Sequence, residues 1–286
     1  TKLYGYDIDC NITRIALVNI RLRVLAILNR RNEDVSFTLW NQIRPNIFKS
    51  SPPDYICGSL STDNKPVIHI LNGHTVGIHT ALGEADVVLT NPPFGSGHDL
   101  RIKEANILSQ YKNGHQWEVS ANGNIVYSDK LNERQGIAPE LLFLEKCLKW
   151  VKEDGIIGIV MAKGQLDNRE ALAIRKTICA QAQILAVVNL HEDTFEPFCG
   201  SKASVIFLRK RANIPSDYRI FMAISNKVGQ TSRGEAIYKK DAEGNPIIRN
   251  GQHILDEDLS EIAQSYKEFQ NGTLVESEFR YTISFS

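Results

Sequence analysis

The 286-residue chain lacks long apolar runs and any excess of charge of one sign. No stretch approaches the roughly 18 consecutive apolar residues of a membrane-spanning helix, and the first residues show neither a signal peptide nor a lipidation motif. Lysine and arginine total 33, as do aspartate and glutamate, so the formal net charge is zero. A self-sufficient nucleic-acid-binding module usually carries a basic bias, so neutrality argues against one while leaving room for local basic patches. No membrane partner is expected.

Cysteine is also sparse, and its spacing excludes two further classes of protein. The five cysteines are scattered and never form a CxxC pair, which favours reduced thiols in a cytoplasmic protein over a disulfide framework or a zinc site. His69, His74 and His79 recur every five residues, a spacing that fits neither a helical nor a clustered metal site. We therefore expect no metal.

Apolar segments alternate between continuous runs and helical spacing along most of the chain. Continuous runs predict buried strands, and apolar stripes of helical period predict helices packed against them. The expected strands cover residues 3–8, 86–90, 156–161, 184–190 and 203–209, and the expected helices cover residues 11–29, 138–152, 167–182 and 256–270. Residues 95–136 are polar and without clear period, as in a long loop. The pattern predicts an α/β fold with a mainly parallel sheet, helices on both faces and an antiparallel edge strand.

The most specific motif is Asn91-Pro92-Pro93-Phe94, directly after the apolar strand at 86–90. In open α/β sheets the ligand crevice lies outside the carboxyl ends of the strands, where this tetrapeptide falls. The prolines restrict the backbone, so the Asn91 amide and the Pro92 carbonyl hold preset directions. The Asn91 amide, the Pro92 carbonyl and the Phe94 ring are together suited to binding a flat ring that bears an exocyclic amino group. The same residues also fit a plain turn that ends a strand.

In this setting the chain resembles the S-adenosylmethionine-dependent DNA adenine-N6 methyltransferases, and more closely the modification subunit of type I restriction–modification systems. The resemblance runs from about Gly5 to Gly272. Beside the tetrapeptide it rests on Gly5-Tyr6-Asp7, Gly136-Ile137-Ala138-Pro139-Glu140, Gly155-Ile156-Ile157-Gly158-Ile159-Val160, Phe195-Glu196-Pro197-Phe198, Ser201-Lys202-Ala203-Ser204-Val205-Ile206-Phe207-Leu208 and the stretch 220–229. It implies a Rossmann-like methyltransferase fold.

The resemblance also implies roles for individual residues. Asn91, Pro92, Pro93 and Phe94 would form the catalytic site, with Phe94 stacked on an adenine flipped out of the duplex. Asp7 would bind the ribose hydroxyls of S-adenosylmethionine and Ile8 would pack on its adenine ring. Ser59 and Leu60, in Cys57-Gly58-Ser59-Leu60, match a family segment that contacts the cofactor, although the aspartate that usually accompanies it is absent here.

One departure from the family pattern concerns the glycine-rich turn. In nucleotide-binding α/β folds it lies about 20 residues before the ribose-binding acid, and Asp7 is the seventh residue. We therefore expect a fragment: residues 1–211 as a methyltransferase domain without its first strand and glycine loop, and residues 212–286 as an extension toward a missing target-recognition region. On this basis the chain alone would be inactive and would bind the cofactor poorly.

Other functions remain open from the sequence. Methylation of cytosine N4 or of a protein glutamine would use a similar pair of carbonyl and amide groups to bind the amino group. The combination of Asn91 and Phe94 favours adenine. A non-catalytic scaffold that binds DNA or a specificity subunit is the alternative outside the enzymes. The expected partners are DNA, a specificity subunit and a restriction subunit.

Overall fold

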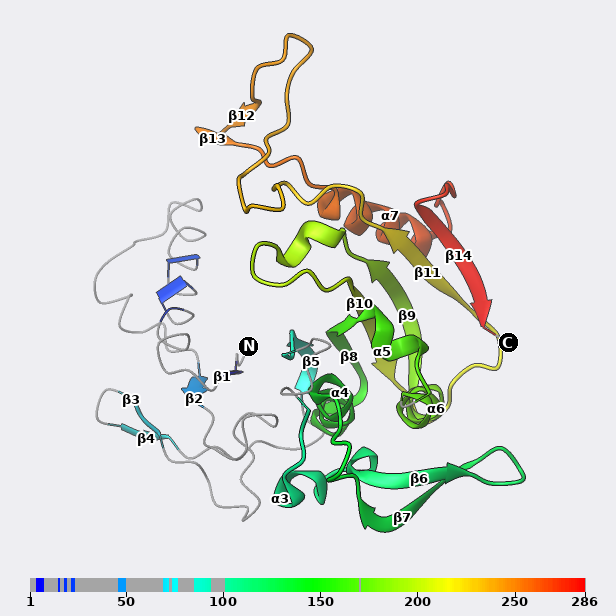
Figure 1. The fold of residues 1–286 in the computed structure, drawn as a ribbon. Helices are drawn as coiled ribbons and strands as arrows, with labels where there is room; N and C mark the ends of the chain where they lie inside the picture. Colours follow the sequence, from blue (N-terminus) through cyan, green and yellow to red (C-terminus); the bar gives the residue numbers. More distant parts are fainter. Residues whose placement is uncertain are drawn as a thin grey trace. The chain divides into compact units, whose positions relative to one another are not determined.

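In the computed structural model, the described residues are 4–7, 15, 18–19, 22–23, 46–49, 69–71, 74–76, 85–93, 101–169 and 171–285. The chain divides into two compact units, residues 1–80 and 81–286 (Figure 1). In the first unit, β1 (Tyr4–Asp7) pairs in parallel with β2 (Asn46–Lys49), and β3 (His69–Leu71) pairs antiparallel with β4 (His74–Val76). The described residues of the predicted helix 11–29 are helical.

The second unit is built on a six-stranded sheet in the order β14-β11-β9-β10-β8-β5. Its strands are β5 (Ala85–Thr90), β8 (Val151–Ala162), β9 (Ala182–Asn189), β10 (Ala203–Lys210), β11 (Tyr218–Ile224) and β14 (Arg280–Phe285). β5 runs parallel to β8 and β9 runs parallel to β11, whereas β10 and β14 are antiparallel to their neighbours. Four strands therefore share one direction, which confirms the mainly parallel sheet.

The antiparallel strands do not all lie where the sequence suggested. β9 and β10 pair antiparallel, as expected for two strands with no intervening long helix. β10 nevertheless lies inside the sheet, between β8 and β9, and the antiparallel strand at the edge is β14. β11 and β14, which follow residue 211, thus continue the sheet of the preceding strands.

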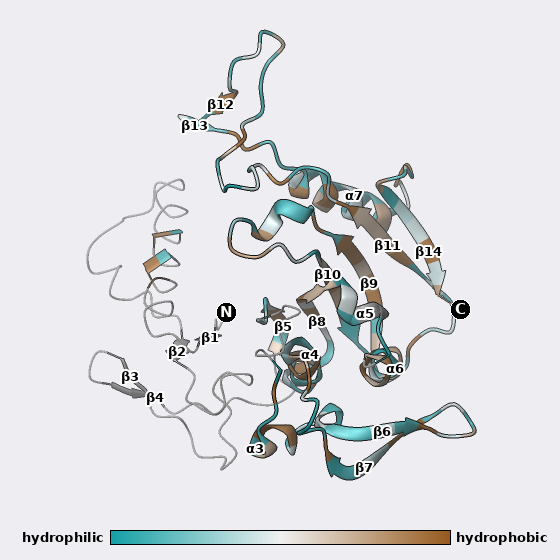
Figure 2. Cartoon of the chain, in the orientation of Figure 1, coloured by the Kyte–Doolittle hydropathy of each residue, from teal (hydrophilic) through white to brown (hydrophobic). Residues whose placement is uncertain are grey.

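Helices cover both faces of this sheet, as expected. α4 (Pro139–Trp150) packs on β8 and α6 (Leu172–Gln181) packs on β9. Alternate residues of β8, such as Ile157 and Ile159, are fully buried on that side. On the other face, Ile262 of α7 (Leu259–Asn271) lies in a cluster with strand residues of β9, β10 and β11. Figure 2 shows the apolar strands between these polar-faced helices.

Proline and asparagine explain where two helices begin. Pro139 occupies the first turn of α4, where its missing N–H costs no hydrogen bond. Before α6, the Asn168 side-chain oxygen accepts a hydrogen bond from the Ala171 N–H at 2.9 Å. The segment after β8 forms the short helix α5 (Lys163–Asp167).

The region predicted as a long loop also contains regular structure. It holds α3 (Ala105–Leu108), the short 3-10 helix η3 (Lys112–Gly114) and a hairpin of β6 (His115–Val119) and β7 (Ile125–Leu131). The hairpin carries many hydrophilic residues (Figure 2), and the adjacent apolar pair Ile125 and Val126 followed by Ser128, Asp129 and Lys130 gives β7 no regular alternation. Smaller elements complete the unit: the 3-10 helix η4 (Glu192–Phe195) and the strands β12 (Ile248–Arg249) and β13 (Gln252–His253).

Candidate active site

Asn91 follows the last residue of β5 and stands at the carboxyl edge of the sheet, the edge where β5, β8, β9 and β11 end. Asn91 is exposed, Pro92 is buried and Pro93 is exposed. Within the described part of the chain, the Asn91 amide has no hydrogen-bond partner. The buried proline fixes the chain where it leaves the strand, and the amide beside it is exposed. Phe94, the fourth residue of the motif, lies outside the described residues.

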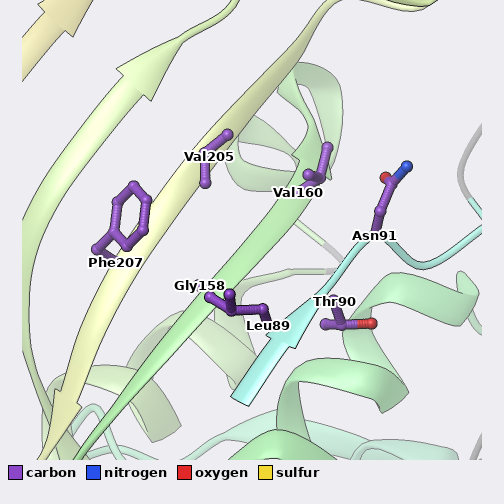
Figure 3. A pocket seen from close by; sticks show the side chains of 7 residues that line it. All are labelled: Leu89, Thr90, Asn91, Gly158, Val160, Val205 and Phe207. Carbon is purple, nitrogen blue, oxygen red and sulfur yellow. The ribbon is translucent and has the colours of Figure 1, made fainter. Parts of the chain in front are cut away.

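A groove of about 330 Å³ begins at Asn91 and runs across three strands (Figure 3). We call it the Asn91 groove; it is lined by Leu89, Thr90, Asn91, Gly158, Val160, Val205 and Phe207. None of these lining residues is titratable, and most are apolar. The groove therefore offers an amide and an apolar floor, and its lining supplies no acid or base.

Gly158 keeps the floor of the groove open. A Cβ at this position would approach Leu89 Cδ2 to 2.7 Å and Phe207 Cε1 to 3.1 Å. Leu89 is itself 72% exposed on the α7 face of the sheet, beside the half-exposed Val87. This end of the face is apolar, and no described residue covers it.

The predicted cofactor residues are described only in part. Asp7 ends β1, and because β1 is paired in parallel with β2, it stands at the carboxyl end of a parallel strand, as a ribose-binding acid would. Its side chain, like Ile8, Ser59 and Leu60, lies outside the described residues. Their assignment to the cofactor stays a prediction.

A second cavity, of about 750 Å³, lies beside the β6–β7 hairpin. We call it the hairpin cavity; it is lined by Gln116, Trp117, Glu118, Val119, Asn132, Arg134, Gln135 and Arg169. The sequence does not predict this cavity, because residues 95–136 show no clear period. The Asn122-Gly123 pair was the available signal, since Gly123 has φ +76° and Asn-Gly is a favoured hairpin turn.

The hairpin is fixed to the fold at its base. The Glu145 carboxylate of α4, only 5% exposed, accepts hydrogen bonds from the backbone N–H groups of Lys112 and Asn113, both at 3.0 Å. It also accepts one from Asn113 Nδ2 at 2.7 Å. Tyr127 of β7 donates to Asn113 Oδ1 at 3.2 Å, and burial raises the pKa of this tyrosine. The hairpin tip is held as well, since Lys176 of α6 donates to the Gly123 carbonyl.

Two acidic residues that follow β9 at the carboxyl edge are ordinary surface groups. Glu192 and Asp193 lie in η4, and Glu192 forms an ion pair with Lys202 at 2.9 Å. The hydrogen bond from Lys202 lowers the pKa of Glu192. In the described residues no group of three or more histidine, cysteine, aspartate or glutamate side chains could hold a metal ion. Of the described helices, none is long and apolar enough to cross a membrane.

Comparison with known proteins identifies the family. The model of the N-6 DNA methylase family matches residues 60–279, so the chain belongs to this family, as its sequence predicted. Among curated proteins none matches the chain.

Solved structures that match part of the chain include the following three. A modification subunit assigned to a type I restriction enzyme of Vibrio vulnificus is 15% identical (TM-score 0.46), with 86% of this chain and 39% of that chain covered. A type I restriction–modification methyltransferase subunit of Streptococcus thermophilus is 17% identical (TM-score 0.44, 71% and 35% covered). A Listeria monocytogenes protein assigned to the class I S-adenosylmethionine-dependent methyltransferases is 13% identical (TM-score 0.44, 78% and 49% covered). The chain thus spans between about a third and a half of these proteins.

Proposed function

We propose that the protein containing this chain methylates the N6 amino group of adenine in DNA, and that Asn91 and Pro92 bind that amino group. The observation that carries the proposal is the exposed Asn91 amide at the carboxyl edge of the sheet, which has no partner among the described residues, in a chain of the N-6 DNA methylase family. Adenine is chosen over cytosine or a protein glutamine because the tetrapeptide begins with Asn91 and ends with Phe94.

The chemistry follows from the two oxygens. An aromatic amine is a poor nucleophile because its lone pair is delocalised into the ring. When the Asn91 side-chain oxygen and the Pro92 carbonyl accept its two hydrogens, the nitrogen is drawn toward a tetrahedral state and its lone pair becomes available. Positioning and electrostatics then supply most of the rate, and no strong general base is needed. The groove lining, which lacks a titratable group, is compatible with this mechanism.

The residues proposed for the cofactor are Asp7, Ile8, Ser59 and Leu60. S-adenosylmethionine, when bound, supplies an electrophilic sulfonium methyl group. Asp7 fits a ribose contact by its place at the carboxyl end of β1. Phe94 is proposed to stack on the flipped base. By sequence resemblance, we further propose a specificity subunit and a restriction subunit as partners, and a cytoplasmic location.

The test is methyl transfer to DNA by the full-length protein, with any specificity partner present. We expect Asn91→Ala to reduce the rate about a hundredfold or more, by analogy with removal of one group that stabilises a transition state. The matched control is Asn271→Ala, which removes an exposed amide at the end of α7. Mass spectrometry of the nucleosides should find N6-methyladenine. Equal rates for wild type and Asn91→Ala would refute the mechanism, and N4-methylcytosine would refute the choice of base.

A further inference from the structure

The hairpin cavity lies at the same edge of the sheet as Asn91. β5 and β8 are parallel, with Thr90 opposite Ile159, so both strands end at the carboxyl edge. Arg169 follows β8 through α5, and Arg134 lies in the segment that leads into the first turn of α4. Because α4 ends where β8 begins, its first turn is also at the carboxyl edge. The segments that carry Arg134 and Arg169 therefore lie toward the same edge of the sheet as Asn91.

The cavity is suited to an anion. Arg134 and Arg169 line it, are exposed, and form no ion pair or hydrogen bond through their side chains within the described part of the chain. A third guanidinium is close, since Arg101 donates to the carbonyl oxygens of Gln135 and Gly136, both at 2.7 Å. Glu118 is the single carboxylate among the lining residues. Arg134 and Arg169 thus line the cavity together with one carboxylate, Glu118.

Other groups of the cavity suit a nucleic acid rather than a simple anion. Trp117, partly exposed on β6, offers an aromatic face on which an unpaired base can stack. The amides of Gln116, Asn132 and Gln135 add hydrogen-bonding groups that can reach sugars and phosphates. The volume of about 750 Å³ is large enough for a nucleotide unit.

We propose that the hairpin cavity binds the DNA strand that carries the target base, with Arg134 and Arg169 on phosphates and Trp117 stacked on a neighbouring base. This inference rests on the proposed function, because it names a second contact of the same substrate. The hairpin is fixed in place by Glu145 at its base and Lys176 at its tip, so the cavity exists before DNA binds.

The test measures DNA binding of the full chain by fluorescence anisotropy, with a labelled single strand and a labelled duplex, over a range of salt concentrations. We expect the double variant Arg134→Gln/Arg169→Gln to weaken binding about tenfold at low salt. For the single strand, the slope of log affinity against log salt should fall by about 1.4, at about 0.7 per lost phosphate contact. Trp117→Leu should weaken binding of the single strand with little change in this slope.

The matched control is Arg249→Gln on β12, an exposed arginine on a hairpin far from β6 and β7 (Figure 1). Thermal unfolding should be unchanged in the arginine variants, because neither side chain has a described partner. No DNA binding by the wild type, or equal affinity and slope in the double variant, would overturn the proposal. The proposal would also be overturned if heparin binding required both arginines while Trp117→Leu left DNA binding unchanged. The anisotropy assay does not measure methyl transfer, so a failure of the proposed function would be detected only in the separate methylation assay.

Discussion

Glu145 offers the sharpest test of how the hairpin is held. Its carboxylate is buried between α4 and η3 and accepts three N–H hydrogen bonds at 2.7–3.0 Å. Oε1 accepts from the Lys112 N–H, and Oε2 accepts from both donors of Asn113. Oε1 also lies 3.0 Å from Lys149 Nζ, a half-exposed ion pair one helical turn away.

The expected magnitude follows from these contacts. In Glu145→Gln one oxygen can keep the two Asn113 bonds, but the new NH₂ group then faces the Lys112 N–H, so a donor meets a donor. A buried group left without its partner costs about 1–3 kcal/mol, and the two surviving bonds lose their charge assistance. The Lys149 pair adds only about 0.5 kcal/mol. We expect a loss of about 2–3 kcal/mol for Glu145→Gln and about 4 kcal/mol for Glu145→Ala, which leaves all three donors without an acceptor.

Urea denaturation gives the free energy of unfolding, and hydrogen exchange locates the loss. Protection should fall most in residues 112–131 and least in β8 and β10, because the hairpin opens before the sheet does. Glu243→Gln, an exposed carboxylate on a turn, is the control and should change stability by less than about 0.5 kcal/mol. If Glu145→Ala matched this control, or if protection fell equally throughout, the carboxylate would not hold the hairpin.

Two further predictions concern buried groups elsewhere in the second unit. Burial opposes ionisation of Asp258, but hydrogen bonds from Ser225, the Asn226 N–H and Arg280 hold the pKa of its carboxyl below the ordinary value. The stability that the ionised carboxylate adds is present above about pH 4 and is lost as pH falls through the folded pKa. Asp258→Ala should therefore lower the free energy of unfolding by about 3 kcal/mol at pH 7. In denaturant titrations the difference in unfolding free energy between wild type and variant should narrow below about pH 4, and a difference that stays constant with pH would contradict the assignment. Burial raises the pKa of the Cys147 thiol to about 12. When the folded protein is alkylated and its peptides are mapped, Cys199 should be modified and Cys147 should remain intact. Equal labelling of the two cysteines would show that α4 does not shield Cys147.

Elements with a strong apolar pattern were predictable from sequence. The core strands β8, β9 and β10 and the helices α4 and α7 agree with their expected ranges to within a few residues, apart from an earlier start of β8 at Val151. Their side chains are buried on a fixed period, so the period is visible in the chain itself. The place of β10 inside the sheet was not predictable, because strand order depends on which strands meet after folding.

The hairpin shows a different limit. Its strands read His115-Gln-Trp-Glu-Val119 and Ile125-Val-Tyr-Ser-Asp-Lys-Leu131, with polar side chains on both faces. It is stabilised by Glu145, which lies more than 30 residues from Lys112 and Asn113 along the chain. A contact between a helix and a distant backbone leaves no period in the local sequence. The arginines of the hairpin cavity were missed for the same reason, whereas Asn91 was found because all parts of its motif are adjacent.

The contrast between Asn91 and Pro92 explains how one short motif can be both rigid and available. Pro92 is buried and anchors the end of β5, while Asn91 remains exposed and without a described partner. In water the free amide costs nothing, because solvent satisfies it. Once a base covers it, an unsatisfied amide oxygen would cost about 1–3 kcal/mol unless the base presents an N–H donor. Under the proposed function, a base with a carbonyl in place of the amino group is thus rejected by the same oxygens that activate adenine, so selectivity and activation arise from one contact.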